Sequence, residues 1–326
     1  MSMQWIVTGA NGYLGGETAQ GLFHMGKRVC GLAREGRSVS VLEEKGIHCD
    51  TYEKLTSVLA PGDIVVHCAG KVGSTGSLEE YLRINVDWSL ALFDQAASGM
   101  ASCFVYVSSV SALGYGNRPG GEALTESSAP RLVEGELYGK SKLQAELALQ
   151  DRALKSSLRL VILRPGFIYG RRPFGSAQTW LRRGVVVDPN QRAPLVHVDS
   201  FINAVVGVGE NPEAKGVFFN VDEEQPSLSE LNALKIRYGL LRYSPWKIGT
   251  IGFWILTLCR NIVRFLQGRF ETAPTSRAWA DYLFRKRRLV YSTEKLRAAA
   301  GWSPAVTLRE GLEGCAKWEK ARNSDQ

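Results

Sequence analysis

Four Tyr-x-x-x-Lys matches are the residues of this sequence whose types and spacing best suit acid–base chemistry. On a helix, residues four apart share one face, so an ammonium group can lie beside a phenol. At about 4 Å and an effective dielectric near 20, that charge is worth roughly 4 kcal/mol, enough to lower a phenol pKa from about 10 toward about 7. The matches are Tyr138/Lys142, Tyr243/Lys247, Tyr282/Lys286 and Tyr291/Lys295.

Position along the chain distinguishes one of these pairs from the other three as the acid–base candidate. Pro245 lies inside the second pair and disfavours a helix there, while the last two pairs flank a basic run near the carboxyl terminus. Tyr138 and Lys142 lie in a helix predicted over Leu137–Leu154. That helix follows a predicted strand, Cys103–Ser108, which ends beside Ser109 at the edge where substrate-holding groups gather. We therefore expect Tyr138 to move a proton and Lys142 to tune it.

A glycine-rich turn at Thr8–Gly15 carries the second chemical signal. Gly9, Gly12 and Gly15 have the spacing G-x-x-G-x-x-G between a predicted strand and a predicted helix. Such glycines allow a tight turn, close approach of a pyrophosphate, and packing of helix on strand. The free amides and dipole of the helix start then hold negative phosphates. The turn predicts a dinucleotide site; a similar turn without a ligand is the alternative.

The end of the second predicted strand, Val29–Ala33, indicates which dinucleotide binds. A carboxylate there would bind the adenosine ribose hydroxyls and repel a 2′-phosphate. Arg34 occupies the position instead, Arg37 follows, and Glu35 is the nearby acid. Because a guanidinium can pair with a 2′-phosphate, NADP(H) is favoured. NAD(H) stays open, since a solvated surface arginine is the alternative.

The elements that must position these residues alternate short apolar runs with amphipathic stretches, which is typical of an α/β Rossmann-type doubly wound parallel sheet. We predict a dinucleotide-binding domain over 1–170 and a smaller carboxyl-terminal substrate lobe over 171–326, with chain crossings back to the sheet and a ligand cleft between the two. The predicted strands are Gln4–Thr8, Val29–Ala33, Ile47–Cys49, Asp63–Cys68, Cys103–Ser108, Leu158–Leu163 and Val217–Val221; the predicted helices are Leu14–Met25, Leu78–Ala97, Leu137–Leu154, Phe201–Val208 and Leu228–Tyr238.

The net charge of +8 is concentrated in residues 242–288, where ten lysines and arginines face Glu271 and Asp281, and ten minus two is +8. This segment includes the apolar stretch Trp246–Leu266. Its uncharged part, Ile248–Cys259, is shorter than the about 20 residues that cross a bilayer. Three alternatives stay open: a lid over a lipophilic pocket, a peripheral contact with anionic lipid, or core. Nucleic acid is not an expected partner, because the cations lie beside apolar residues.

Cysteines and histidines indicate no metal and no disulfide framework. The six cysteines are scattered without a Cys-x-x-Cys pair, so we expect buried free thiols in a reducing compartment. The four histidines are equally dispersed, and no metal site is expected. Met1 runs almost directly into a predicted strand without a signal-peptide pattern, so we expect a cytoplasmic protein.

Taken in order, these motifs resemble the motif series of the extended short-chain dehydrogenases/reductases. The resemblance implies that Ser109 is the catalytic hydroxyl beside Tyr138 and Lys142, and that Asn85 supports the fold and a proton relay. The motifs are Thr8–Gly15, His67–Gly70, Asn85-Val86, Ser108-Ser109, Tyr138-x-x-x-Lys142, Arg164–Gly170 and Val196–Asp199. The implied cofactor contacts are Gly9, Asn11, Gly12, Tyr13, Leu14, Gly15, Arg34, Ala69, Gly70, Asn85, Tyr138, Lys142, Pro165 and Ile168.

The substrate class follows from the branch that the chain resembles. Sugar-nucleotide dehydratases of this family place Asp-Glu after the catalytic hydroxyl, whereas Val110-Ser111 follows Ser109 here, which disfavours dehydration. The apolar segment, Tyr291–Leu296 and Gly301–Pro304 resemble the 3β-hydroxysteroid dehydrogenase branch and its 2-alkyl-3-oxoalkanoate reductase relatives. This implies hydride exchange on a hydrophobic ketone or alcohol (β-keto acyl, sterol-like or polyketide) by a homodimer. A nucleotide-sugar epimerase and a non-catalytic NADP-binding regulator stay open.

Overall fold

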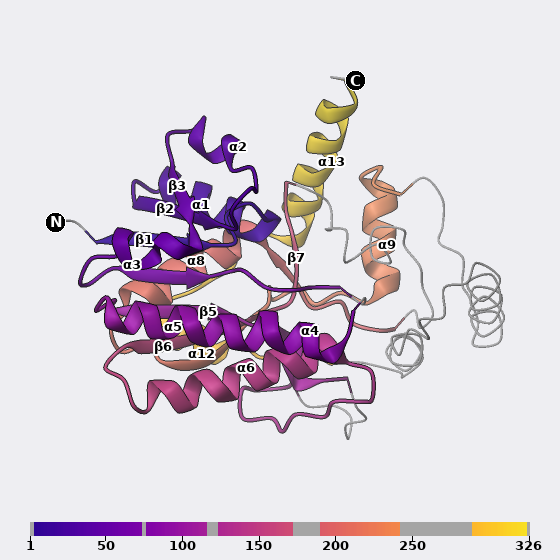
Figure 1. The fold of residues 1–326 in the computed structure, drawn as a ribbon. Helices are drawn as coiled ribbons and strands as arrows, with labels where there is room; N and C mark the ends of the chain where they lie inside the picture. The colour runs from indigo at the N-terminus through magenta and orange to yellow at the C-terminus, as the bar shows by residue number, and fades with distance from the viewer. Residues whose placement is uncertain (1–2, 74–75, 116–122, 172–189, 242–288, 325–326) are drawn as a thin grey trace, which may run out of the picture.

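A computed structural model describes residues 3–73, 76–115, 123–171, 190–241 and 289–324. Within these ranges the main sheet has seven parallel strands in the order β3-β2-β1-β4-β5-β6-β9 (Figure 1). The first six follow the order of a doubly wound dinucleotide-binding sheet, as predicted. The strands are β1 (Gln4–Thr8), β2 (Arg28–Ala33), β3 (His48–Thr51), β4 (Ile64–His67), β5 (Cys103–Val107), β6 (Arg159–Pro165) and β9 (Gly216–Asn220).

The strands are apolar throughout because helices cover both faces of the sheet. In β5, Val105 packs with the layer of α1, α8 and α12, while Phe104 packs with the layer of α3, α5 and α6. The two layers flank the sheet in Figure 1. The first layer is α1 (Tyr13–His24), α8 (Val198–Glu210) and α12 (Glu294–Ala300); the second is α3 (Leu55–Val58), α5 (Trp88–Ser98) and α6 (Leu137–Ala153).

The predicted helix Leu78–Ala97 contains an irregularity that the sequence did not indicate. Helix α4 (Leu78–Leu82) passes into α5 through a π-helical turn at Arg83–Asp87. A π-helical turn inserts an extra residue, and such turns are frequent at functional sites. Asn85, the buried residue of this turn, belongs to the candidate site below.

The carboxyl-terminal part of the chain contributes to both the sheet and a second cluster. Strand β9 and helix α8 return to the main sheet, whereas α9 and α13 lie together with a two-stranded parallel sheet (Figure 1). Their shared apolar cluster includes Tyr169 and Leu312. The division at residue 170 stays a prediction. The elements of this cluster are β7 (Phe167–Tyr169), β8 (Leu195–His197), α9 (Leu228–Arg237) and α13 (Leu308–Ser324).

Some sequence predictions lie outside the described residues. They are the apolar segment Trp246–Leu266, with its peripheral membrane contact, and the pairs Tyr243/Lys247 and Tyr282/Lys286. In the part of the chain that the structure describes, no helix is both long and apolar enough to cross a membrane. The five cysteines in these ranges are free.

Candidate active site

The glycine-rich turn joins β1 to α1 and is packed too tightly for side chains at two positions. Gly9 has φ +74°, and a Cβ there would lie 2.9 Å from the backbone nitrogen of Ala69. A Cβ on Gly15 would overlap the carbonyl oxygen of Gly9. Gly12 differs, because a Cβ there would meet only that same oxygen, at 3.2 Å, and the residue is exposed. Gly9 and Gly15 are therefore required for close packing of the backbone, whereas Gly12 leaves the surface of the turn accessible to a ligand.

The start of α1 fits the pyrophosphate of a dinucleotide. Gly12 is the N-cap, and among the described residues no side chain caps this helix. Tyr13 and Leu14 begin the first turn, which contains no acid. Asn11 is exposed beside them. The positive end of the helix dipole therefore meets no acid and no capping side chain of its own helix, which suits an external anion.

Arg34 follows the strand next to β1, the strand that leads into the glycine-rich turn. It directly follows β2 and is exposed. Burial raises the pKa of Tyr52, while a hydrogen bond from Gly9 and the positive charge of Arg34 lower it. The Tyr52 hydroxyl accepts a hydrogen bond from the amide of Gly9 at 3.2 Å. Sequence reasoning missed Tyr52, although its place just after β3 puts it at the same sheet edge.

Asn85 ties the loop after β4 to helix α6. Its Oδ1 accepts a hydrogen bond from the amide of Lys71 at 2.7 Å, and its Nδ2 donates to the carbonyl of Lys71 at 3.0 Å. The same Nδ2 donates to Ser141 Oγ at 2.9 Å, and Ser141 donates to the carbonyl of Tyr138 at 2.8 Å. One buried amide therefore fixes the first turn of α6 against the end of β4.

His67 joins β1, β4 and α5 beneath the site. Its Nδ1 lies 2.7 Å from Thr8 Oγ1, and its Nε2 lies 2.9 Å from Ser89 Oγ. Burial, aided by the charge of Lys142, lowers the pKa of His67 to about 3. The imidazole is therefore neutral at physiological pH and links the elements rather than exchanging protons.

Lys142 is buried at the carboxyl end of β5. Its Nζ donates to the carbonyl of Val107 at 2.7 Å and to the hydroxyl of Tyr106 at 3.2 Å. Burial lowers the pKa of Lys142 to about 8, and the carboxylate of Glu146 opposes that change. A Cβ on Gly70 would lie 3.4 Å from this ammonium. The structure thus brings Gly70 and Lys142 together, and their contact with a cofactor stays a prediction.

Tyr138 and Ser109 are brought together as well. Burial raises the pKa of the Tyr138 phenol above its ordinary value of 10, and a hydrogen bond with the Ser109 side chain lowers it. The predicted lowering toward 7 by Lys142 is wrong for this conformation, because burial dominates. The ammonium instead donates to Val107 and Tyr106.

A second hydroxyl pair adjoins Ser109. Ser109 Oγ accepts a hydrogen bond from the amide of Ser111 at 3.1 Å, and Ser111 Oγ lies 2.6 Å from the hydroxyl of Tyr115. A Cβ on Gly139 would overlap the Ser111 carbonyl oxygen, so this turn packs directly on α6. Val110 is buried. The two positions that hold acids in dehydratases thus carry an aliphatic and a hydroxyl side chain.

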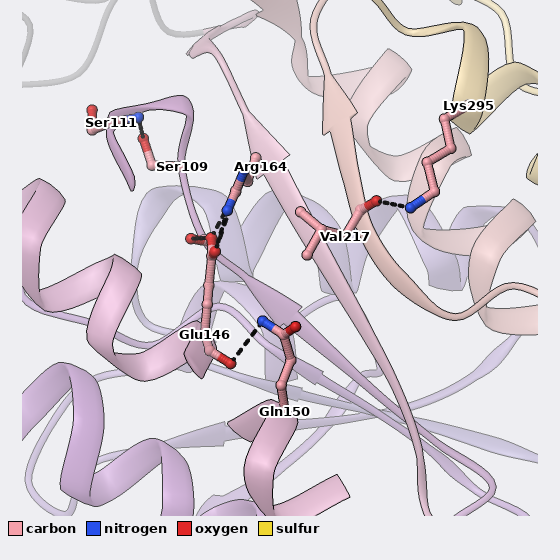
Figure 2. A network of polar contacts seen from close by, with 8 residues as sticks. Ser109, Ser111, Glu146, Gln150, Arg164, Val217 and Lys295 are labelled. Atoms are coloured by element: carbon pink, nitrogen blue, oxygen red, sulfur yellow. Dashed lines mark hydrogen bonds and ion pairs between the residues drawn. The ribbon is translucent and has the colours of Figure 1, made fainter. Parts of the chain in front are cut away.

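Other candidates lie in different surroundings. Pro165 ends β6, and Ile168 in β7 packs against the same apolar cluster as Leu14 of α1. Tyr291 is buried next to Leu124, while Lys295 donates to the carbonyl of Val217 at 2.7 Å (Figure 2). This pair does not form an acid–base unit.

Glu146 and Arg164 form a buried ion pair, with 2.6 Å between Oε2 and Nη2, that sequence reasoning missed (Figure 2). The available signals were an acid four residues after Lys142 on a helix and an arginine at the end of a buried strand.

Comparisons with known proteins agree with this geometry. Residues 5–221 match the model of the NAD dependent epimerase/dehydratase family. The UDP-glucose 4-epimerase of Vibrio cholerae is 26% identical over 78% of this chain and 76% of its own. The 2-alkyl-3-oxoalkanoate reductase of Stenotrophomonas maltophilia is 26% identical over 95% of this chain and 97% of its own. The UDP-glucuronic acid 4-epimerase of Bacillus cereus, solved with UDP-glucuronic acid and NAD, shares the fold with a TM-score of 0.74 at 20% identity, covering 98% of this chain and all of that one.

Proposed function

Because the chain belongs to the NAD dependent epimerase/dehydratase family, we propose that it is an NADP(H)-preferring reductase. Its substrate is a hydrophobic ketone or the corresponding alcohol, with a β-keto acyl compound as the first choice and sterol-like or polyketide ketones next. When bound, the nicotinamide supplies the hydride for the carbonyl carbon.

The observation that carries the proposal is the proximity of Ser109 to Tyr138 at the edge of the sheet where Lys142 is also buried. In reduction, Ser109 holds the substrate oxygen by donating a hydrogen bond. Tyr138 gives its phenolic proton to that oxygen as negative charge develops on it. Lys142, one helical turn further along α6, supplies a buried positive charge on the same helix as this phenol.

The substrate class is supported by the length of the alignment with one relative. The alignment with the 2-alkyl-3-oxoalkanoate reductase spans 95% of this chain, so it includes the carboxyl-terminal part where a substrate lobe is predicted. The turn after Ser109 also lacks the acids that dehydration requires. A hydrophobic keto substrate needs neither a nucleotide site nor an acid pair there.

The preference for NADP(H) is supported by the exposed Arg34, whose charge acts on Tyr52 next to the glycine turn. A 2′-phosphate would pair with its guanidinium, whereas NAD(H) offers it no such group.

The test is a screen for NADPH oxidation with β-keto acids, steroid ketones and aldehydes, repeated with NADH. We expect oxidation with a β-keto compound and a lower KM for NADPH than for NADH. No oxidation by any carbonyl compound would argue against a reductase, and equal KM values would argue against the cofactor preference.

An epimerase is the second candidate, favoured by the 26% identity to a UDP-glucose 4-epimerase over 78% of the chain. An epimerase uses a transient keto intermediate, so product would form with no net change in nicotinamide absorbance. Chromatography of UDP-sugars incubated with the protein and NAD distinguishes this activity from reduction.

We also propose a homodimer through α5 and α6. The two helices pack on each other, and α6 exposes Leu147 and Leu154, which retain 58% and 85% of their accessible surface. A second copy that packs on α5 and α6 would remove both leucines from water.

A further inference from the structure

The carboxylate of Glu146 lies at the junction of three elements that carry or support the active site (Figure 2). It follows Lys142 by one helical turn on α6. Its Oε1 accepts hydrogen bonds from Ser108 Oγ at 2.5 Å and from Arg164 Nε at 2.9 Å, and its Oε2 accepts from Arg164 Nη2 at 2.6 Å. One side chain therefore links α6 to the ends of β5 and β6.

Stability alone does not account for this ion pair. Glu146 is fully buried and Arg164 retains only 5% of its accessible surface. The free energy lost when two charges are removed from water offsets much of the free energy gained from their attraction. Apolar replacements of such pairs are therefore often neutral or stabilising. The pair is therefore better explained by what it holds: Ser108 precedes Ser109 in the chain, and Lys142 lies on the preceding turn of α6.

We infer that Glu146 is a positioning residue that acts through two neighbours. Through Ser108 it fixes the end of β5 and so the place of Ser109. Its negative charge balances the buried ammonium of Lys142, while Arg164 holds the carboxylate in place. The inference rests on the proposed roles of Ser109 and Lys142 and adds a residue that touches neither substrate nor cofactor.

The surroundings of Lys142 show why this charge matters. Burial lowers the pKa of Lys142 to about 8, and Glu146 is the first of the groups that oppose the change. The neighbouring groups come from four elements. They are His67 from β4 and Cys68 just after it, Tyr106 from β5, Tyr138 and Glu146 from α6, and, through Glu146, Arg164 from β6. His67 and the thiol of Cys68, with pKa values of about 3 and about 12, are neutral near pH 8.

The inference predicts shifts of opposite sign for the two members of the pair. In Glu146→Gln, Lys142 faces the unbalanced charge of Arg164 and loses its proton at lower pH. In Arg164→Met, the unbalanced carboxylate keeps Lys142 protonated to higher pH. We expect the alkaline limb of the pH profile to move down by about one pH unit in the first variant and up by a similar amount in the second.

The experiment measures kcat/KM for carbonyl reduction and, separately, NADPH binding by tryptophan fluorescence, between pH 6 and 10. The Lys142→Met variant identifies the group that causes the alkaline limb. This variant should show no such limb in the pH profile of NADPH binding. Ser108→Ala is the matched control, since it removes one hydrogen bond to Glu146 but no charge. It should lower kcat without moving the limb.

The double variant Glu146→Gln/Arg164→Met leaves the sum of the local charges unchanged. It replaces the single variants in the experiment if circular dichroism shows that one of them does not fold. Its limb should stay within a few tenths of a pH unit of the wild-type value. Single variants that move the limb in the same direction or leave it in place, or a double variant that moves it by a full unit, would overturn the inference. Opposite shifts in NADPH binding, in a chain that reduces no carbonyl compound, would refute the proposed function while supporting the role of Glu146.

Discussion

Replacing Lys142 with methionine should stabilise the folded chain while it removes turnover. Lys142 has a pKa of about 8 in the folded chain against an ordinary value of 10.5, which corresponds to about 3 kcal/mol spent on keeping the ammonium buried at pH 7. Methionine fills similar space, but it leaves Val107 and Tyr106 without a donor, which costs about 1–2 kcal/mol. We expect a net gain of about 1–2 kcal/mol in the free energy of unfolding.

The dependence of this gain on pH follows from the direction of the pKa change. Below about pH 8 the lysine is charged in both states, and the full penalty lies on the folded state. Between about 8 and 10.5 the folded chain releases its proton first, so the unfolded chain binds more protons and wild-type stability rises with pH. The advantage of Lys142→Met should therefore shrink across this interval.

Urea unfolding without added cofactor, monitored by circular dichroism at pH 7 and pH 9.5, measures the stability gain of Lys142→Met and its dependence on pH. Lys140→Met is the control, because Lys140 is exposed on the same helix and its replacement should change stability by less than about 0.5 kcal/mol. A Lys142→Met chain that is less stable than wild type at pH 7, or a difference that is the same at both pH values, would refute the reasoning.

Four further outcomes are expected. Tyr138→Phe should reduce kcat by about 10²–10⁴-fold and leave NADPH binding unchanged in a fluorescence titration; retained turnover would remove Tyr138 from the mechanism. Arg34→Ala should weaken NADPH binding by about 10-fold or more without affecting NADH, and equal losses for both would assign Arg34 another role. Gly15→Ala should destabilise the chain by about 1–3 kcal/mol in thermal unfolding, because its Cβ would overlap the Gly9 carbonyl oxygen; an unchanged Tm would mean that the turn relaxes. Leu147→Glu should give a monomer by light scattering if α6 forms the dimer interface, and an unchanged mass would place the interface elsewhere.

The sheet and its helices could be predicted because their signals are local. Continuous apolar runs such as Cys103–Val107 occur where a strand is covered on both faces, and the glycine spacing around Gly12 follows from backbone packing. The predicted strands and helices accordingly lie where the sequence put them, with ends that differ by a few residues. The choice of Tyr138/Lys142 among four pairs depended on the same local signals, since the helix after β5 was visible in the sequence.

The features that escaped prediction depend on contacts between distant residues. Glu146 and Arg164 are 18 positions apart and meet only because α6 packs across β6. Tyr52 reaches Gly9 across 43 residues. The pKa of Tyr138 is raised and not lowered because burial outweighs the other effects, and only the folded chain reveals that burial.

The extra residue in the turn Arg83–Asp87 keeps the buried side chains before and after the turn on the same side of the helix. In a regular α-helix each step of four residues advances about 40° beyond a full circle, so buried positions spaced by four drift around the axis. The wide turn cancels that drift, and Tyr81, Asn85 and Ser89 all face inward. Winding the same residues as a regular α-helix would rotate everything after the turn by about 100°. His67 would then lose its hydroxyl partner on α5, and the apolar side of that helix would swing toward water.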